Sequence, residues 1–277
     1  MQPDVFIHSE EALRQPAAAT LVLIHGFMGS GADWQSVTDE IRPHHPDLRL
    51  LMPDLPGHGR TPYTSGDGDF HVFIDGLHQR LQQECRGPVF LAGYSLGGRV
   101  AMALATAWPD AYQGLLVESA SPGISDAGER AARLAADRQL LDAVLRHPAG
   151  SLAREEAQRH FLQSWYANPI FTGFSQWSGY SKLLERKARE DARGWQESMA
   201  LLSTGNMPDL RPGLSRLRIP AVYVCGNLDE KYCSTGRELA RDGRFRLHCI
   251  EDASHNIHSP LPGLFYRALT LLWQVAG

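Results

Sequence analysis

One stretch decides the fold of this 277-residue chain: Pro88-Val-Phe-Leu-Ala-Gly-Tyr-Ser-Leu-Gly-Gly-Arg-Val-Ala-Met-Ala-Leu104. The apolar run at 89–92 predicts a buried strand, and the alanine-rich run at the end, which lacks proline, predicts a helix. Between them, Gly93-Tyr94-Ser95-Leu96-Gly97 forms a G-x-S-x-G motif. In a strand–turn–helix context this motif is typical of a nucleophile elbow, whose small flanking residues let the turn close and expose the serine hydroxyl.

Strands and helices alternate on both sides of this turn. Further strands are predicted at 5–8, 20–24, 48–52, 114–118, 221–225 and 245–250. Helices are predicted to start near Trp34, with Asp33 as a capping residue, and to span 70–85 and about 264–275. This alternation indicates an α/β fold with a mostly parallel sheet flanked by helices.

The alternation stops between residues 124 and 205. That segment contains no good strand and predicts several helices, broken at His147-Pro148, Asn168-Pro169 and Gly173. We therefore expect an α/β core formed by residues 1–122 and 206–277, interrupted by a helical cap at 123–205.

Composition and charge exclude several classes of function. The chain is 43% hydrophobic and 21% charged with a net charge of −4, so no overall attraction to nucleic acid or anionic membranes is expected. Its four cysteines show neither C-x-x-C spacing nor a disulfide framework, and no metal site or cofactor is predicted. The N-terminus has no signal-peptide pattern, and no apolar run is long enough to span a membrane. The sequence predicts a cytoplasmic location and leaves the oligomeric state open.

A serine that reacts through its hydroxyl needs an imidazole to take its proton and a carboxylate to orient that imidazole. In this architecture the three follow the chain order Ser, acid, His, with the later two just past strands. Asp229 follows the strand at 221–225, and His255 follows the strand at 245–250. Ser95, Asp229 and His255 are therefore the predicted catalytic triad.

Two backbone N–H groups are predicted to form an oxyanion hole, those of Leu96 after the elbow serine and Phe27 after an early strand. Other acids and histidines fit less well. Asp209 precedes its strand, and Asp252 is too near His255 in sequence for the expected topology. His25 and His58 lie in glycine-containing turns, where structural hydrogen bonds are expected. His248 lies within a strand, and His258 either lines the pocket or is exposed.

Taken together, these residues resemble the α/β-hydrolase superfamily. Narrower segments resemble the 2-succinyl-6-hydroxy-2,4-cyclohexadiene-1-carboxylate (SHCHC) synthases, lyases of menaquinone biosynthesis, over about residues 20–270. The segments are Gly93–Met102, Asp54-Leu-Pro-Gly-His-Gly59, Glu118-Ser-Ala-Ser-Pro-Gly123, Ala136-Asp-Arg-Gln139, Trp165-Tyr166, Pro169-Ile-Phe171, Pro208-Asp-Leu210 and Ser254-His-Asn-Ile-His258. The chain departs from the family pattern at Ser119-Ala120, where glycines are expected, and at Ser254, where glycine is expected. These departures loosen the substrate assignment, not the triad.

The resemblance implies an α/β-hydrolase fold with the cap inserted after the sixth strand. It also implies elimination of pyruvate from a ring that carries several carboxylates, with serine as general base and no cofactor. The substrate-binding set that it implies is Arg99, Arg133, Arg186, Tyr94 and Trp165.

Arg99 lies four residues after Ser95 on the same face of the elbow helix, and a buried arginine there needs an anionic partner, either the substrate or an internal acid such as Glu118. The 24 arginines against 3 lysines follow equally from genome composition. Two other classes stay open: a serine hydrolase of a carboxylate-bearing ester, thioester or C–C bond, and a non-catalytic hydrolase-fold receptor.

Overall fold

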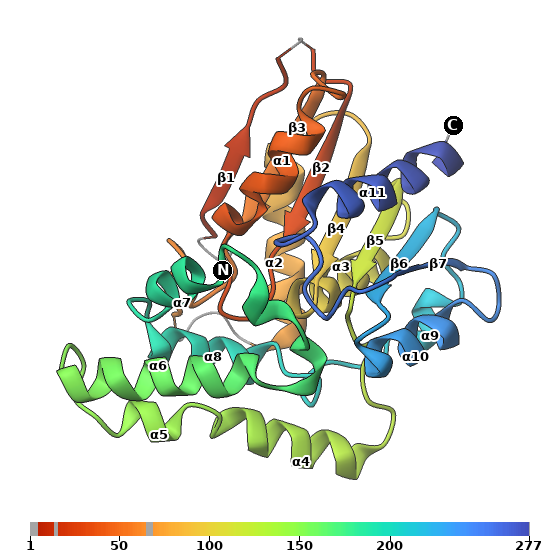
Figure 1. Cartoon of the computed structure of the whole chain (residues 1–277). Coiled ribbons are helices and arrows are strands. Elements are labelled where there is room, and N and C mark those ends of the chain that lie inside the picture. The colour runs from red at the N-terminus through yellow and green to blue at the C-terminus, as the bar shows by residue number, and fades with distance from the viewer. Residues whose placement is uncertain (1–4, 14–15, 65–68, 277) are drawn as a thin grey trace.

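The computed structural model describes residues 5–13, 16–64 and 69–276. Within them, seven strands form one sheet in the order β1-β3-β2-β4-β5-β6-β7 (Figure 1). The strands are β1 Ile7–Glu10, β2 Ala19–Ile24, β3 Leu48–Pro53, β4 Val89–Tyr94, β5 Gly114–Glu118, β6 Ala221–Gly226 and β7 Phe245–Ile250. β1 pairs antiparallel with β3, and every other pairing is parallel. The mostly parallel sheet predicted from the alternating pattern is confirmed.

The order of the strands reverses between β2 and β4. From β2 the chain passes to β3 on one side, and then returns to place β4 on the other side. In open α/β sheets, ligands bind outside the carboxyl ends of the strands at such a reversal. Phe27 follows β2 and Ser95 follows β4, so the sequence brings both predicted groups to this point.

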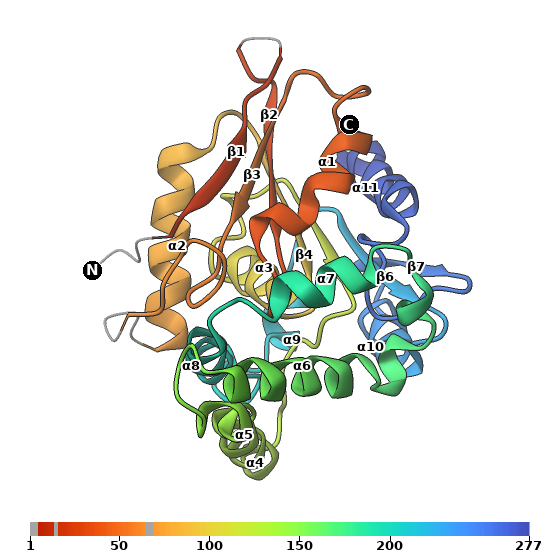
Figure 2. The same cartoon turned by 60° about the vertical axis from the view of Figure 1, so that its left-hand side comes forward.

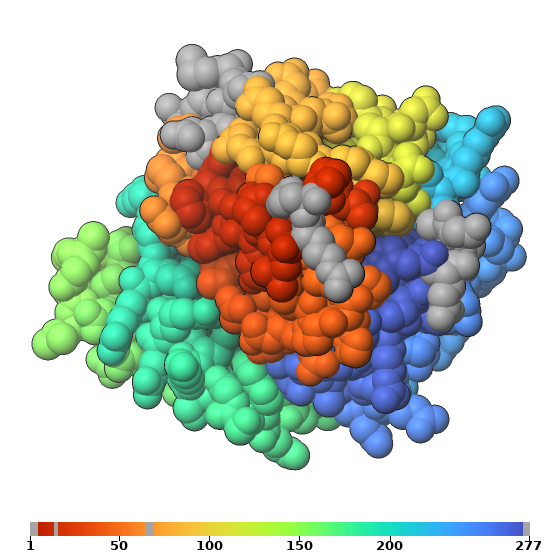
Figure 3. All heavy atoms as spheres, turned by 90° about the horizontal axis from the view of Figure 1, so that it is seen from above, coloured from red at the N-terminus to blue at the C-terminus, as the bar shows by residue number. Residues whose placement is uncertain are grey.

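Helices cover both faces of the sheet. α1 (Gln35–Ile41) and α11 (Pro262–Ala276) lie side by side on one face, as seen from above in Figure 3. α2 (Phe70–Glu84), α3 (Leu96–Ala107), α9 (Arg211–Leu214) and α10 (Glu230–Leu239) cover the other. Residues of β2 alternate between the two cores: Leu21 and Leu23 pack with α1 and α11, while Val22 and Ile24 pack with α2 and α3. This alternation follows from the two-residue period of a strand and explains why the run is apolar throughout.

A helical segment separates β5 from β6. It contains α4 (Ala127–Arg138), α5 (Asp142–Leu145), α6 (Leu152–Tyr166), α7 (Tyr180–Lys187) and α8 (Ala192–Leu201), with 3-10 turns at Pro169–Phe171 and Phe174–Gln176. Figures 1 and 2 both place α4, α5, α6 and α8 beyond the carboxyl ends of the parallel strands. The predicted breaks at His147-Pro148 and Gly173 fall between these elements, and the 3-10 turn Pro169–Phe171 begins at the predicted break Asn168-Pro169. The domain boundaries at 123 and 205 stay a prediction.

Two details of the predicted fold are wrong. The helical segment follows the fifth strand of the described residues rather than the sixth, because the sheet edge consists of the single antiparallel strand β1, which pairs directly with β3. Asp33 does not cap α1: it lies inside a 3-10 turn at Gly31–Trp34, whose own N-cap is Ser30. Its carboxylate accepts from the Ser30 N–H in the capping box of that turn (3.3 Å) and pairs with α7. No helix within the described residues combines the length and apolar character needed to cross a membrane.

Candidate active site

The turn after β4 has the geometry of a nucleophile elbow. Ser95 has φ 50° and ψ −107°, a strained conformation for a residue with a side chain. A Cβ at Gly93 would lie 2.3 Å from the carbonyl oxygen of Gly97, and a Cβ at Gly97 would lie 2.1 Å from that of Ile24. Both glycines are therefore required by close backbone contact. The Ser95 N–H donates to the Glu118 carbonyl (2.8 Å), which ties the turn to β5.

Ser95, His255 and Asp229 lie in one hydrogen-bonded row. The Ser95 hydroxyl lies 3.0 Å from Nε2 of His255, and Nδ1 of the same ring lies 2.7 Å from Oδ2 of Asp229. Asp229 and His255 are 1% and 2% exposed, so water does not compete for the bond between them. In this arrangement the carboxylate fixes the tautomer that leaves Nε2 free to take the serine proton.

Two loops position the acid and the histidine. Asp229 follows β6 as the N-cap of α10, where its second oxygen accepts from the Tyr232 N–H (3.2 Å). The turn that follows β7 carries His255, and the His255 N–H donates to the Ile170 carbonyl of the helical segment (2.9 Å). The histidine backbone is thus held by the insertion as well as by the core.

The loop after β2 is fixed by two buried histidines. His25 Nδ1 lies 2.7 Å from the Gly26 carbonyl, and its Nε2 accepts from the Leu55 N–H (2.9 Å). His58 Nδ1 lies 3.0 Å from the Pro56 carbonyl, and its Nε2 accepts from the Met28 N–H (3.0 Å). Burial lowers the pKa of both rings, well below its usual range for His58. The structural role predicted for these histidines is confirmed, and what they position is the backbone on both sides of Phe27.

A cavity of about 540 Å³ opens above Ser95. Among the predicted residues, it is lined by Phe27, Tyr94, Ser95, Arg99, Arg133, Trp165 and His255. The Trp165 ring packs edge-on against Phe27 at 5.3 Å, and the Tyr94 ring lies 5.3 Å from that of His255. The cavity therefore combines aromatic walls with cationic groups next to the hydrogen-bonded residues Ser95, His255 and Asp229.

Arg99 is a cation for which the described part of the chain supplies no acidic partner. Its side chain is buried and donates to the Leu202 carbonyl (2.8 Å), yet no carboxylate of the described residues lies within 4 Å of it. Burial lowers the pKa of Arg99 to about 10, still well above neutrality. The internal pair with Glu118 considered from the sequence does not form. Glu118 accepts instead from the N–H groups of Ile257 (2.6 Å) and His258 (3.2 Å), and its second oxygen lies 2.9 Å from the His258 ring nitrogen.

Arg133 is held on α4 by a carboxylate one helical turn away. Its Nε lies 2.8 Å from both oxygens of Asp137, and Asp137 also accepts from the Ser203 hydroxyl (2.7 Å). The guanidinium group lines the cavity, so it is oriented before any ligand arrives.

Arg186 does not line the cavity; its neighbour Lys187 does. Arg186 donates to the Asp33 carboxylate. The Lys187 ammonium group lies 3.6 Å from the other oxygen of Asp33 and donates to the Met28 carbonyl. Lys187 is only 2% exposed. Burial alone would raise the pKa of Asp33, but the two cations outweigh it and hold that pKa at about 2. Lys187 thus joins α7 to the loop that carries Phe27.

Sequence reasoning missed Lys187, although one signal was available: it is one of only three lysines in a chain with 24 arginines. It also left the place of His258 open, and the structure buries that ring against Trp34 (4.2 Å) in the cavity wall. Ser119, where the family pattern has glycine, has φ 49° and a buried hydroxyl that finds no hydrogen-bond partner within the described residues. A positive φ explains why glycine is favoured there.

Comparisons with known proteins agree with this geometry. A model described as the alpha/beta hydrolase family matches residues 21–268. The 2-succinyl-6-hydroxy-2,4-cyclohexadiene-1-carboxylate synthase of Yersinia pseudotuberculosis serotype O:3 (strain YPIII) is 36% identical over 259 residues, covering 93% of this chain and 88% of its own. The structure of MenH from S. aureus superposes with a TM-score of 0.83 at 22% identity over 98% of both chains. A malate-bound thermophilic esterase from Thermogutta terrifontis reaches 0.70 at 20% identity, covering 98% of this chain and 93% of its own. At these identities the two structures support the fold alone.

Proposed function

Because this chain belongs to the α/β-hydrolase family, and within it to the 2-succinyl-6-hydroxy-2,4-cyclohexadiene-1-carboxylate synthases, we propose that it eliminates pyruvate from 2-succinyl-5-enolpyruvyl-6-hydroxy-3-cyclohexene-1-carboxylate. The observation that carries the proposal is the cavity beside Ser95, where Arg99 is buried with no acidic partner among the described residues. A buried guanidinium group of this kind matches a substrate carboxylate, which would supply the missing charge and hydrogen bonds.

In the proposed reaction, Ser95 acts as a general base. His255 takes the serine proton through Nε2, and Asp229 stabilises the resulting imidazolium. The Ser95 alkoxide then removes a proton from the carbon beside the succinyl carbonyl. The electron pair moves onto the carbonyl oxygen, and its return forms a new ring C=C bond while the ring carbon–oxygen bond to the enolpyruvyl group breaks. The leaving enolate takes up a proton, which returns His255 to its neutral form, and tautomerises to pyruvate.

Negative charge on that oxygen requires donors already in place. We assign them to the N–H groups of Phe27 and Leu96. Leu96 is the first residue of α3, where a backbone N–H has no acceptor within the helix and the helix dipole favours negative charge. The hydrogen bonds made by His25 and His58 hold the loop that carries the Phe27 N–H. Each donor in such a hole contributes about 2.7–4 kcal/mol to the transition state.

The substrate carboxylates are assigned to Arg99 and Arg133, with Tyr94 and Trp165 packing against the ring. Arg186 reaches the substrate only by leaving Asp33, so its place in the set depends on breaking that ion pair. We further propose that residues 123–205 act as the cap of this site and that the enzyme works in the cytoplasm on a small-molecule substrate.

A coupled assay for pyruvate tests the proposal. Purified enzyme is mixed with the synthase substrate, and released pyruvate is followed by NADH consumption with a pyruvate-reducing dehydrogenase. We expect turnover with wild-type enzyme and almost none with Ser95→Ala. If folded wild-type enzyme releases no pyruvate, the proposed function is wrong.

One observation favours a second candidate, a serine hydrolase of a carboxylate-bearing substrate. The 3.0 Å contact between the Ser95 hydroxyl and His255 also suits a serine that attacks a carbonyl carbon. The two reactions differ in whether Ser95 becomes acylated. Mass spectrometry of enzyme quenched during turnover is expected to show unmodified Ser95, and deuterium at the abstracted position is expected to slow the chemical step. An adduct on Ser95 would instead assign the chain to the hydrolases.

A further inference from the structure

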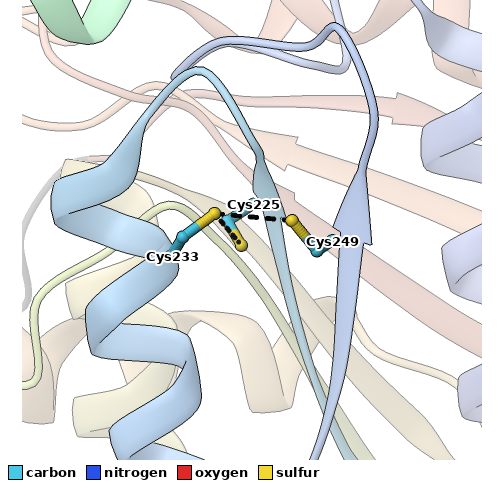
Figure 4. Close-up of side chains that lie close together, drawn as sticks. All are labelled: Cys225, Cys233 and Cys249. Carbon is cyan, nitrogen blue, oxygen red and sulfur yellow. Dashed lines mark hydrogen bonds between the residues drawn. The ribbon is translucent and has the colours of Figure 1, made fainter.

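Three thiols meet outside the catalytic cavity, on the side of the sheet covered by α10. Cys225 of β6 and Cys249 of β7 are register partners in parallel strands, so both side chains point to the same face. Figure 4 shows Cys233 of α10 reaching toward both of them. The Cys233 sulfur lies 2.9 Å from that of Cys225 and 3.5 Å from that of Cys249, and all three lie within 4.8 Å of one another.

These separations are close to those of sulfurs that share one metal ion. A zinc–thiolate bond is about 2.3 Å long, and sulfurs bound at that length around one ion lie roughly 4 Å apart. To reach that spacing, the Cys225–Cys233 separation has to widen by about 1 Å and the Cys233–Cys249 separation by about 0.5 Å. The Cys249 side chain is exposed, which gives it freedom to turn and gives an ion a path from solvent.

The donor set selects the class of ion. All three ligands are sulfur, which favours soft ions such as Cu(I) over Mg²⁺, Ca²⁺ or Mn²⁺. Zinc in structural sites takes four ligands, and within the described residues the cluster includes no fourth histidine, cysteine, aspartate or glutamate. Cu(I) is satisfied by two or three thiolates, so it fits this set best.

Burial argues against the alternative use of the cluster as a reactive disulfide pair. Burial raises the pKa of the Cys225 thiol and raises that of Cys233 to about 11. Thiols with raised pKa values are poor nucleophiles toward disulfides and peroxide, because the thiolate is the reactive form. A metal ion can still displace these protons into solvent. The Arg237 guanidinium, one helical turn after Cys233, acts in the same direction by favouring the thiolate.

We propose that Cys225, Cys233 and Cys249 form a binding site for a single soft, thiophilic metal ion, with Cu(I) as the best match. The site adjoins the catalytic loop without sharing a residue with the triad. The Cys233 N–H donates to the Asp229 carbonyl (2.9 Å). The Cys233 thiol donates to the Gly226 carbonyl (3.1 Å) while the cluster is empty, and a bound ion would replace that hydrogen bond. A bound ion would therefore clamp the turn that carries Asp229 to β6 and β7.

The test is a competition titration on the full chain, reduced and kept free of oxygen. Cu(I) is supplied as its coloured complex with bicinchoninate, and colour loss reports the metal that the protein removes. Wild-type protein is expected to remove one equivalent, less of it as the pH falls, because protons compete for the thiolates. Cys85→Ser is the matched control, since Cys85 lies outside the cluster, and it is expected to match the wild type.

Two variants make the outcome decisive. Cys249→Ser changes an exposed side chain, and in Cys233→Ser the hydroxyl can still donate to the Gly226 carbonyl, so both are designed to fold. Each is expected to lose more affinity than the roughly 10–100-fold typical of an outer-shell change. Bound Cu(I) is also expected to protect Cys249, but not Cys85, from alkylation.

Two results would overturn the site: wild-type protein that removes no Cu(I), or undiminished binding in both cluster variants. Neither bears on pyruvate release, so the two proposals fail independently.

Discussion

Replacing Arg99 with methionine is expected to lower activity without lowering stability. The Arg99 side chain is 7% exposed, and its hydrogen bond within the protein goes to the Leu202 carbonyl (2.8 Å). Burial lowers its pKa from 12.5 to about 10. At about 1.36 kcal/mol per pKa unit, holding the charged group in the unliganded cavity costs about 3 kcal/mol.

Methionine removes that cost along with one charge-assisted hydrogen bond, which contributes roughly 1.5–3 kcal/mol. The difference between the burial cost and the hydrogen bond is about 0 to 1.5 kcal/mol. We therefore expect Arg99→Met to have a free energy of unfolding equal to that of the wild type or up to about 1.5 kcal/mol higher. The same 1.5–3 kcal/mol, lost from a substrate carboxylate in the transition state, lowers kcat/KM by roughly 10- to 150-fold. Arg99→Lys keeps the charge but not the planar fork, so it is expected to recover part of the loss.

Urea unfolding and the pyruvate-release assay measure the two effects on the same preparations. The argument is refuted if Arg99→Met retains wild-type kcat/KM. It is also refuted if the variant loses more than about 2 kcal/mol of stability, because Arg99 would then be a structural residue rather than a binding group kept at a cost.

Three further predictions follow from the site. Ser95→Ala and His255→Ala should each remove nearly all turnover, with little further loss in the double variant, and additive losses would contradict a coupled triad. Asp229→Asn should lower kcat by up to roughly 10⁴-fold. Lys187→Met removes the donor to the Met28 carbonyl and should lower kcat/KM by roughly 10- to 150-fold, so unchanged kinetics would exclude a role in holding the loop. Burial lowers the pKa of His58, so this ring binds a proton less readily in the folded protein than in the unfolded chain. The free energy of unfolding should therefore fall as the pH drops below about 6.5. In unfolding experiments between pH 7 and about 5, His58→Gln should weaken this dependence on pH.

The elements that the sequence predicts well are those set by local pattern. The strands β2, β4 and β6 are apolar runs of six residues, and each ends where turn residues begin. The predicted order of Ser95, Asp229 and His255 follows from topology, because the carboxyl ends of neighbouring parallel strands meet at one edge of the sheet. Local pattern and topology are both readable from one chain.

The contacts that the sequence does not predict are those made between distant segments. Asp33 has the spacing of a helix cap, but its partners are 153 residues away at Arg186 and one residue further at Lys187. The rotation of α7 about its axis decides whether Arg186 or Lys187 lines the cavity, and the spacing of residues along the sequence does not reveal that rotation. The sequence does not predict the cysteine cluster for the same reason, because Cys225 and Cys249 become neighbours only through the register of β6 and β7.

The same long-range contacts explain how a helical insertion can govern chemistry located in the core. The insertion accepts the His255 N–H at Ile170 and donates from Lys187 to Met28, next to Phe27. One contact thus holds the backbone of the proposed proton acceptor, and the other holds the loop of a proposed oxyanion donor. Since both contacts come from segments that also line the cavity, a ligand that shifts those segments acts on the proton relay and on the donor loop together. Two contacts of the insertion therefore link the cavity wall to the proposed proton acceptor and to the loop of a proposed oxyanion donor.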